Sequence, residues 1–395
     1  MLWINFLHFY QPPTASDEVV GEAADKSYCR LVKAMKAQPK LKFTVNIAGC
    51  LLERLALLGY EDLISDFKKL IAAGQLEIVG SAAYHPFLPV LDDAEIIRQI
   101  KLNETILKKY LGQTPIVGFF SPEMAYSPRL AKLIKKMGFK WLLIDEIALS
   151  GNLRKNQVDY ETAYIEKTSR LTIVFRDRGL SKNYVPKNLL DVLNKNKISS
   201  QICLTATDAE LYGLRHNDLS ASLEKIMHHE QISCKTISEY LSTLSKTALI
   251  SPLCSSWEST AKELIAGQPY RLWHDQKNKV QVKLWQLADL AQKAVNQGAV
   301  DPNYVWARYH LDRGLASCAW WWASGNDFEL FGGPAWNPDE IIKGATELVK
   351  GVRSLEAPRS KNYKLRAEKI FSELQLMVWQ KHWQEFWGKG NKAKK

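Results

Sequence analysis

Up to about residue 250, seven short apolar runs alternate with longer stretches that have the periodicity of amphipathic helices. The stretch 92–111, for example, places Ile96, Ile100 and Leu107 on one stripe of 3.6-residue period. Repeated strand, helix and strand patterns indicate parallel strands joined by right-handed crossovers. Seven repeats favour a closed or nearly closed barrel over an open sheet. The apolar runs lie at residues 2–7, 43–47, 76–80, 116–120, 141–144, 171–175 and 202–206.

The pattern changes after residue 250, where eleven of the thirteen tryptophans lie. A stretch rich in Ser, Gly and Pro comes first, and helical patterns follow near 280–297, 302–324, 337–357 and 362–387 without strand signals. We therefore predict an α/β chain with an incomplete, TIM-like (β/α)7 barrel followed by an α-helical C-terminal domain. The expected parts are a catalytic barrel over 1–250, a loop-rich connection lining the cleft over 251–280, the helical domain over 281–388, and a disordered basic tail over 389–395.

The composition is that of an ordinary globular enzyme, with 46% hydrophobic and 24% charged residues. The sequence has no apolar run of about 18 residues, and its first residues lack the basic leader of a secretory signal, so we expect no membrane partner. Six scattered cysteines without a CxxC pair favour a reducing compartment, the cytoplasm. The net charge of +11 is partly concentrated in the C-terminal tail. A solvated basic surface is therefore favoured over a nucleic-acid partner.

Polar residues follow nearly every predicted strand. Because βα loops converge at the carboxyl ends of parallel strands, these residues are expected to share one rim. Each one alone is also compatible with a helix cap, but the set as a whole indicates an active site. Its members are His8, Asn46, His85, Glu123, Asp145, Glu146, Arg176, Asp177 and Asp208.

Two of these rim residues are carboxylates that come just past buried runs far apart in the sequence. Glu123 follows the run 116–120 and Asp208 follows the run 202–206. A pair of carboxylates is the minimum equipment for cleaving a glycosidic bond, one as acid and the other as nucleophile or base. The alternative for either residue is a cap of the helix that follows.

Five short segments follow one another along the chain. They are HFYQP at 8–12, GQLEIVG at 74–80 leading to YHP at 84–86, GFFSPE at 118–123, DAELYG at 208–213 and SCAWWW at 317–322. In this order they resemble glycoside hydrolase family 57, a group of α-glucan-active enzymes with a (β/α)7 barrel and a helical C-terminal region. Each segment is weak alone, but the order of all five is specific and spans nearly the whole chain.

The resemblance implies that Glu123 is the nucleophile and Asp208 the general acid/base of a retaining mechanism. The carboxyl groups of a retaining pair stand about 5–5.5 Å apart, and we expect that spacing here. His8 and His85 match histidines that line the subsite next to the scissile bond, and the alternative for each is a satisfied core histidine. Gln11 belongs to the first segment and is a further candidate for sugar binding.

Other candidates for substrate binding come from position and residue type. Glu210 and His216 follow Asp208 closely, and each is a candidate to orient it or to bind sugar. Flat aromatic side chains stack on the apolar C–H faces of pyranose rings. The aromatic candidates in rim or loop positions are Tyr10, Phe120, Tyr126, Trp257, Trp273 and, from the triple tryptophan, Trp321.

The sequence departs from the family pattern at two places. Phe119 and Phe120 stand where the family often has Trp, and Cys318 stands where an Asp commonly follows the Ser. The second departure removes a hydrogen-bonding group and leaves room for a different linkage preference or reduced activity. The chain is also short for the family, with little room for the long insertions that branching enzymes use.

These observations predict a retaining α-glucan hydrolase of the amylase or amylopullulanase type, acting on α-1,4 linkages with α-1,6 linkages as a second candidate. A 4-α-glucanotransferase with the same pair, an α-galactosidase and an impaired, glycan-binding family member stay open. A metal-dependent carbohydrate enzyme is disfavoured because His8 is followed by Phe9 and Tyr10 and so begins no HxD motif, and because no HxxxH spacing occurs in the sequence. We expect no cofactor and no catalytic metal.

Overall fold

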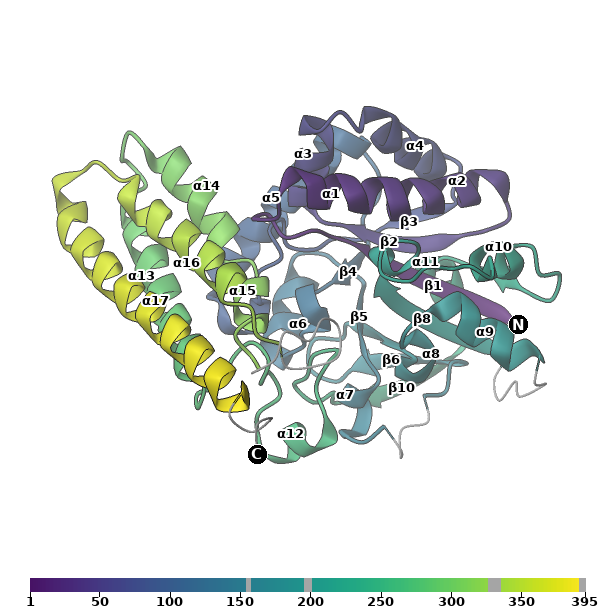
Figure 1. Ribbon diagram of the computed structural model, residues 1–395. Helices are drawn as coiled ribbons and strands as arrows, with labels where there is room; N and C mark the ends of the chain where they lie inside the picture. The colour runs from purple at the N-terminus through teal and green to yellow at the C-terminus, as the bar shows by residue number, and fades with distance from the viewer. Residues whose placement is uncertain (154–157, 195–200, 326–334, 391–395) are drawn as a thin grey trace. The chain divides into compact units, whose positions relative to one another are not determined.

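The computed structural model describes residues 1–153, 158–194, 201–325 and 335–390. The chain divides into two compact units, drawn from purple to yellow along the chain in Figure 1. Unit 1 comprises Met1–Gln11, Ala15–Ala83 and Leu88–Ala266, and unit 2 comprises Pro12–Thr14, Tyr84–Phe87 and Gly267–Lys395. The stretch 251–280, expected as a connection, therefore contributes residues to both units.

Seven parallel strands of unit 1 come from the seven predicted apolar runs. They form two sheets, with the order β3-β2-β1-β8 in one and β7-β5-β4 within the other. Gly80 pairs with Phe119 between β3 and β4, and the Asp177 N–H donates a 2.8 Å bond to Leu204 O between β7 and β8. These bonds close the ring and confirm the predicted (β/α)7 barrel. The strands are β1 (Leu2–Phe9), β2 (Phe43–Ile47), β3 (Leu76–Ile78), β4 (Gly118–Phe120), β5 (Trp141–Asp145), β7 (Thr172–Arg176) and β8 (Ile202–Asp208).

Three further strands extend these sheets and have no counterpart in the sequence prediction. β6 (Thr162–Glu166) pairs antiparallel with β7, and β10 (Lys246–Ile250) adds to β6 in parallel. The short β9 (Ser233–Cys234) pairs with the start of β1. All three are largely half-buried or exposed, so they lack the continuous apolar run that marks a strand buried on both faces.

A continuous hydrophobic core takes side chains from β1, β4, β5, β7 and β8. Because successive side chains of a strand point to opposite faces, its members recur at two-residue intervals. Ile4 and Phe6 come from β1, and Leu204 and Ala206 come from β8. The same alternation decides which later residues of each strand continue this core toward the carboxyl end.

The helices of unit 1 bury one apolar face and carry their own start signals. α5 (Asp93–Leu111) begins after Asp92, whose Oδ1 accepts a 2.7 Å bond from the Glu95 N–H. This agrees with the predicted helix over 92–111. The others are α1 (Asp17–Ala23), a π-helical turn (Ala24–Tyr28), α2 (Cys29–Ala37), α3 (Gly49–Leu57), α4 (Glu61–Ala72), α6 (Pro128–Lys136), α7 (Ile147–Ser150), α8 (Arg178–Ser181), α9 (Val185–Asn194), α10 (Ser222–Met227), α11 (Ile237–Ser242) and α12 (Ala261–Ile265).

Unit 2 is helical in the part that the structure describes. α16 (Pro338–Arg353) packs against α13 (Lys279–Gln297), α14 (Tyr304–Gly314), α15 (Cys318–Trp321) and α17 (Lys361–Gly390). The helix predicted over 302–324 is interrupted because Ala316 forms a bridge with Pro86 and the Ser317 N–H donates to His85 O. α17 continues to Gly390, and residues 391–395 of the expected tail lie outside the described residues.

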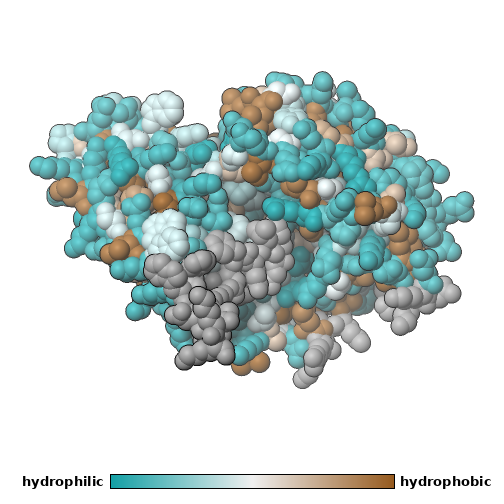
Figure 2. Space-filling view, viewed as in Figure 1, coloured by the Kyte–Doolittle hydropathy of each residue, from teal (hydrophilic) through white to brown (hydrophobic). Residues whose placement is uncertain are grey.

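The face drawn in Figure 2 is mainly hydrophilic, with hydrophobic residues scattered between hydrophilic ones. In the part of the chain that the structure describes, no helix has the length and apolar character needed to cross a membrane.

Candidate active site

Polar side chains continue the core at the carboxyl ends of two neighbouring strands. His8 lies two residues after Phe6 on β1, and Asp208 lies two residues after Ala206 on β8. The two strands are in register, with the Cα of His8 opposite the Cα of Asp208. The rim position predicted for these two residues therefore follows from strand alternation and parallel pairing.

Glu123 lies in a strained turn just after β4. Its φ is 61° and that of Met124 is 47°, so two consecutive non-glycine residues adopt left-handed backbone conformations. Such conformations cost on the order of 1–3 kcal/mol each and cluster at functional sites. The Trp257 N–H donates a 3.0 Å bond to the Glu123 carbonyl oxygen and holds the turn from a distant loop. The side chain is largely buried, with 8% of its surface exposed.

The carboxyl group of Asp208 is in an environment that favours its protonated form. Burial, the nearby Glu210 and then Glu123 hold the pKa of Asp208 well above its usual range, while Arg176 acts in the opposite direction. The residue still keeps some accessible surface. The charge of Glu123 raises the pKa of Asp208 only because the two predicted catalytic carboxylates lie near each other.

Glu210 is held beside Asp208 by two polar partners. Gln11 Nε2 donates a hydrogen bond to its Oε2, and Arg215 Nε lies 3.1 Å from its Oε1. Burial raises the pKa of Glu210, and the Arg215 charge and the Gln11 hydrogen bond oppose that rise. Gln11 is itself buried and lies 3.3 Å from the Tyr28 hydroxyl. Gln11 and Glu210 thus form one buried pair next to the candidate acid.

His8 is buried and uncharged at neutral pH. Burial lowers the pKa of His8 to about 3, although the hydrogen bond with Asn46 opposes this. His8 Nδ1 lies 2.8 Å from Asn46 Oδ1. When Nδ1 donates this bond, Nε2 carries the lone pair and can accept a hydrogen bond from a hydroxyl group. The ring stacks on Tyr10 at 5.5 Å and contacts Phe120 at 4.7 Å between centroids.

The aromatic candidates differ in how much ring surface they present. Trp257 is half-buried, and its ring centroid lies 6.3 Å from that of His8. Phe120 and Tyr126, each 0% exposed, and Trp273, 1% exposed, lie in the interior. These three rings differ from the expected sugar platforms because their faces are covered by protein atoms. Trp273, for example, is stacked on Phe87 at 5.2 Å.

Two further histidine candidates contact a serine and a tyrosine side chain. His85 belongs to unit 2, where its Nδ1 lies 3.0 Å from Ser317 Oγ. His216 stacks on Tyr184 at 4.2 Å between centroids, next to the Asp218 carboxylate that accepts the Tyr184 hydroxyl proton. The contact of His216 with Tyr184 is a packing contact.

Trp321, the last aromatic candidate, is half-buried in unit 2 and contacts Trp322 at 4.6 Å between centroids. Its neighbour Trp320 is fully buried and stacks on Trp285 at 4.3 Å. The three consecutive tryptophans therefore divide between packing and partial exposure, as helical geometry requires.

A buried ion network behind the carboxylates was only partly visible in the sequence. Asp145, with 0% exposure, accepts hydrogen bonds from the guanidinium groups of both Arg176 and Arg178. Asp145 and Arg176 were placed at the rim by sequence, whereas Arg178 was missed. Glu258 was also missed, although it adjoins Trp257 and its charge contributes to the raised pKa of Asp208. The sequence signal that could have identified Arg178 was the group of charged residues at the ends of β5 and β7.

Among the residues described, no group of three or more His, Cys, Asp or Glu side chains is arranged to hold a metal ion. The two carboxylates, the neutral histidine and the half-buried Trp257 instead form a site suited to acid–base and nucleophilic chemistry on a neutral polyol.

The model of glycosyl hydrolase family 57 matches residues 15–252. The chain belongs to glycosyl hydrolase family 57. This confirms the resemblance recognised in the five sequence segments. Glu123, Arg176, Asp208 and Glu210 all fall within the matched range.

Curated relatives in family 57 carry two kinds of name. An alpha-amylase of Pyrococcus horikoshii is 24% identical over 285 residues, covering 67% of this chain and 44% of the relative. A 4-alpha-glucanotransferase of Thermococcus litoralis is 26% identical over 285 residues, covering 67% of this chain and 43% of the relative. The chain thus spans less than half the length of these relatives.

Solved structures of family 57 share the fold. The crystal structure of the Thermococcus litoralis 4-alpha-glucanotransferase aligns with a TM-score of 0.71 at 19% identity, over 90% of this chain and 60% of that one. The alpha-amylase AmyC of Thermotoga maritima aligns with a TM-score of 0.66 at 15% identity, over 95% of this chain and 98% of that one. At these identities the likeness establishes the fold.

Proposed function

We propose that this chain is a retaining glycoside hydrolase that acts on α-glucans, with Glu123 as nucleophile and Asp208 as general acid/base. The observation that carries the proposal is the electrostatic setting of Asp208, whose pKa is raised by burial, by Glu210 and by Glu123. A carboxyl group that keeps its proton beside a second carboxylate is the arrangement that retaining cleavage requires.

In the first step, a carboxylate oxygen of Glu123 attacks the anomeric carbon, and the bond from that carbon to the leaving oxygen breaks. Asp208 transfers its proton to the leaving oxygen, which yields a glycosyl ester on Glu123. In the second step, Asp208 takes a proton from water, the water oxygen attacks the anomeric carbon, and Glu123 leaves as a carboxylate.

The same electrostatics support the change of role between the two steps. The negative charge of Glu123 is one of the causes that raise the pKa of Asp208. Esterification removes that charge, so the pKa of Asp208 falls in the intermediate and the group becomes a base. His8 Nε2 and the half-buried Trp257 supply a neutral acceptor and an aromatic edge for the sugar without a competing charge.

A 4-α-glucanotransferase is the second candidate, because a sugar hydroxyl can replace water in the second step with the same residues. A relative at 26% identity carries that name. Two further alternatives use the same mechanism. They are a preference for α-1,6 linkages, as in an amylopullulanase, and an α-galactoside substrate. We propose the cytoplasm as its compartment, supported by six free cysteines, all in described residues.

The test is incubation of the purified chain with maltoheptaose in the presence of a chelator, with products followed by chromatography and by proton NMR of the new reducing ends. Shorter sugars alone, released first as α-anomers, support the hydrolase. A ladder above seven units supports the transferase. First release of β-anomers contradicts retention. An unchanged substrate, with a folded protein, contradicts action on α-1,4-glucans, and α-galactosides and glycan binding are then tested.

A further inference from the structure

Arg176, the last residue of β7, uses all three guanidinium nitrogens in bonds to different parts of unit 1. Its Nε donates to Asp145 Oδ2 at 2.7 Å, its Nη1 to Ala206 O at 3.1 Å, and its Nη2 to Trp257 O at 3.0 Å. The guanidinium carbon also lies 5.4 Å from the centre of the Trp257 ring. The side chain is 8% exposed, so these bonds are made largely away from bulk water.

Two of these bonds connect Arg176 to the backbone segments of the candidate catalytic carboxylates, one directly and one through Trp257. Ala206 lies two residues before Asp208 on the same strand. Trp257, whose carbonyl oxygen accepts from Arg176, donates its own N–H to the Glu123 carbonyl oxygen at 3.0 Å. The planar guanidinium of Arg176 is therefore bonded to the strand that carries Asp208 and, through Trp257, to the turn that carries Glu123. A guanidinium offers donors in a fixed fork that the flexible ammonium of lysine lacks.

Arg176 also brings the positive charge that opposes the rise in the pKa of Asp208. Its charge is not fully cancelled by its partner, because the Asp145 carboxylate is shared with Arg178. The ionisable groups around Arg176 come from several elements of unit 1. They are Asp145 at the end of β5, Asp177 and Arg178 after β7, Asp208 at the end of β8, and Glu258 in the loop after β10.

We propose that Arg176 is a positioning residue that holds the Glu123 turn and the Asp208 strand at their working separation and supplies the counter-charge of the pair. Its effect on catalysis rests on the function proposed above. Its effect on Asp208 rests only on the contacts in unit 1.

Arg178 provides a matched control. It is also buried, and it forms the same ion pair with Asp145 through Nε and Nη2. Its Nη1 donates to Ser259 O at 2.8 Å, two residues beyond the carbonyl that Arg176 holds. Replacing either arginine leaves Asp145 with the other guanidinium, so both substitutions carry a similar risk to folding.

The first experiment compares Arg176→Lys and Arg176→Met with Arg178→Lys and Arg178→Met, by the pH dependence of kcat/KM on maltoheptaose. Loss of the charge in Arg176→Met raises the pKa of Asp208 further, so the high-pH limb moves up by about one unit. Arg176→Lys keeps the limb but lowers kcat on the order of 100-fold, because the fork that sets the geometry is lost. Both Arg178 variants keep the wild-type limb. Equal limbs and equal kcat in the two sets overturn the inference.

The second experiment needs no substrate and separates this inference from the proposed function. The carboxyl carbons of aspartate are labelled with 13C, Asp208 is assigned by its absence in Asp208→Asn, and its pKa is read by NMR titration. We expect a higher pKa of Asp208 in Arg176→Met than in Arg178→Met. Equal values overturn the inference even if the enzyme is active. An inactive wild-type chain with the expected difference overturns the proposed function and keeps the role of Arg176.

Discussion

The Trp257 N–H donates to the carbonyl oxygen of Glu123, a residue held at a φ of 61°. The two residues are far apart in the sequence, and the loop that carries Trp257 follows the last strand of unit 1. A single backbone hydrogen bond thus ties the left-handed turn of the candidate nucleophile to a distant loop. Because a strained turn persists only where its surroundings over-determine it, this bond helps to keep the carboxylate in place.

The roles of the two carboxylates are separable with azide. We expect Glu123→Ala and Asp208→Ala each to lower kcat by about 10²–10⁴-fold or more, because a catalytic group is lost while its strand remains. Azide restores turnover of an activated α-glucoside in both. The product is the β-azide with Glu123→Ala, where azide replaces the nucleophile, and the α-azide with Asp208→Ala. The α-azide from Glu123→Ala would reverse the assignment, and thermal melts check that both variants fold.

Glu210→Gln is expected to move the high-pH limb of kcat/KM to lower pH by about one unit. The charge of Glu210 is the second largest cause of the raised pKa of Asp208, so its removal lets Asp208 lose its proton earlier. The measurement is the pH profile on maltoheptaose. Glu224→Gln, which removes a carboxylate paired with Arg30, serves as the control and keeps the wild-type limb. An upward shift in Glu210→Gln contradicts the electrostatic account.

His8 is expected to make the protein less stable as the pH falls. Its pKa is about 3 in the folded chain against 6.5 for an ordinary histidine, so the unfolded chain takes up the proton first. The contribution of His8 to the free energy of unfolding is fully present above pH 6.5 and is lost as the pH falls toward 3. Between pH 7 and 5 it amounts to about 2 kcal/mol.

The measurement is the free energy of unfolding in urea at pH 7 and pH 5. His8→Gln loses less stability over this interval than the wild type, by about that amount. In His228→Gln, at an exposed site, we expect the difference in unfolding free energy between pH 7 and pH 5 to stay close to that of the wild type. Equal pH dependence in His8→Gln and the wild type would show that burial does not suppress the charge of His8.

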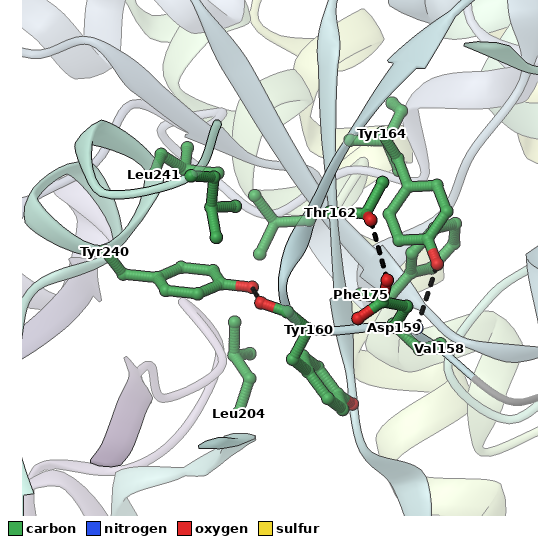
Figure 3. A pocket seen from close by; sticks show the side chains of 12 residues that line it. Val158, Asp159, Tyr160, Thr162, Tyr164, Phe175, Leu204, Tyr240 and Leu241 are labelled. Carbon is green, nitrogen blue, oxygen red and sulfur yellow. Dashed lines mark hydrogen bonds between the residues drawn. The ribbon is translucent and has the colours of Figure 1, made fainter. Parts of the chain in front are cut away.

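Tyr240→Phe is expected to lower stability without affecting the site. Its hydroxyl donates to Tyr160 O at 2.6 Å beside a small cavity of about 10 Å³, whose lining includes Leu204 and Phe175 (Figure 3). Loss of the bond leaves a half-buried carbonyl without this donor and costs about 1 kcal/mol.

Urea unfolding and kcat on maltoheptaose measure the two effects of Tyr240→Phe. Tyr164→Phe is the control, since the Tyr164 hydroxyl accepts a 2.9 Å bond from the exposed N–H of Asp159, which water can satisfy (Figure 3). We expect a smaller loss in Tyr164→Phe. A reduced kcat in Tyr240→Phe would show that this end of the barrel is coupled to the carboxylates.

The seven barrel strands could be predicted because each is buried on both faces and reads as a continuous apolar run. β6 and β10 could not, because they lie outside the ring with one face toward solvent. Their threonines, alanines and charged residues give no clear period over five residues. The break between α14 and α15 was missed for a different reason, since bonds at Ala316 and Ser317 with residues far earlier in the sequence end the helix.

For the aromatic candidates too, the sequence identified the residues but could not predict their exposure. Residue type and loop position identified Trp257 and Tyr126 equally well, yet Trp257 keeps accessible surface and Tyr126 has none. The backbone of Tyr126 pairs with Ser255, two residues before Trp257. Which ring of a neighbouring pair faces solvent depends on how two loops pack, and local sequence carries no record of that packing.

By itself, the sequence determined the barrel, the family and the candidate catalytic pair, because buried parallel strands and short ordered segments are local patterns. Only the tertiary structure decided the protonation of Asp208 and the support of Glu123. Both depend on groups that are distant in the chain, namely Arg176, Glu210 and the Trp257 backbone. Burial and charge act through space, and the distances that set their strength exist only once the chain has folded.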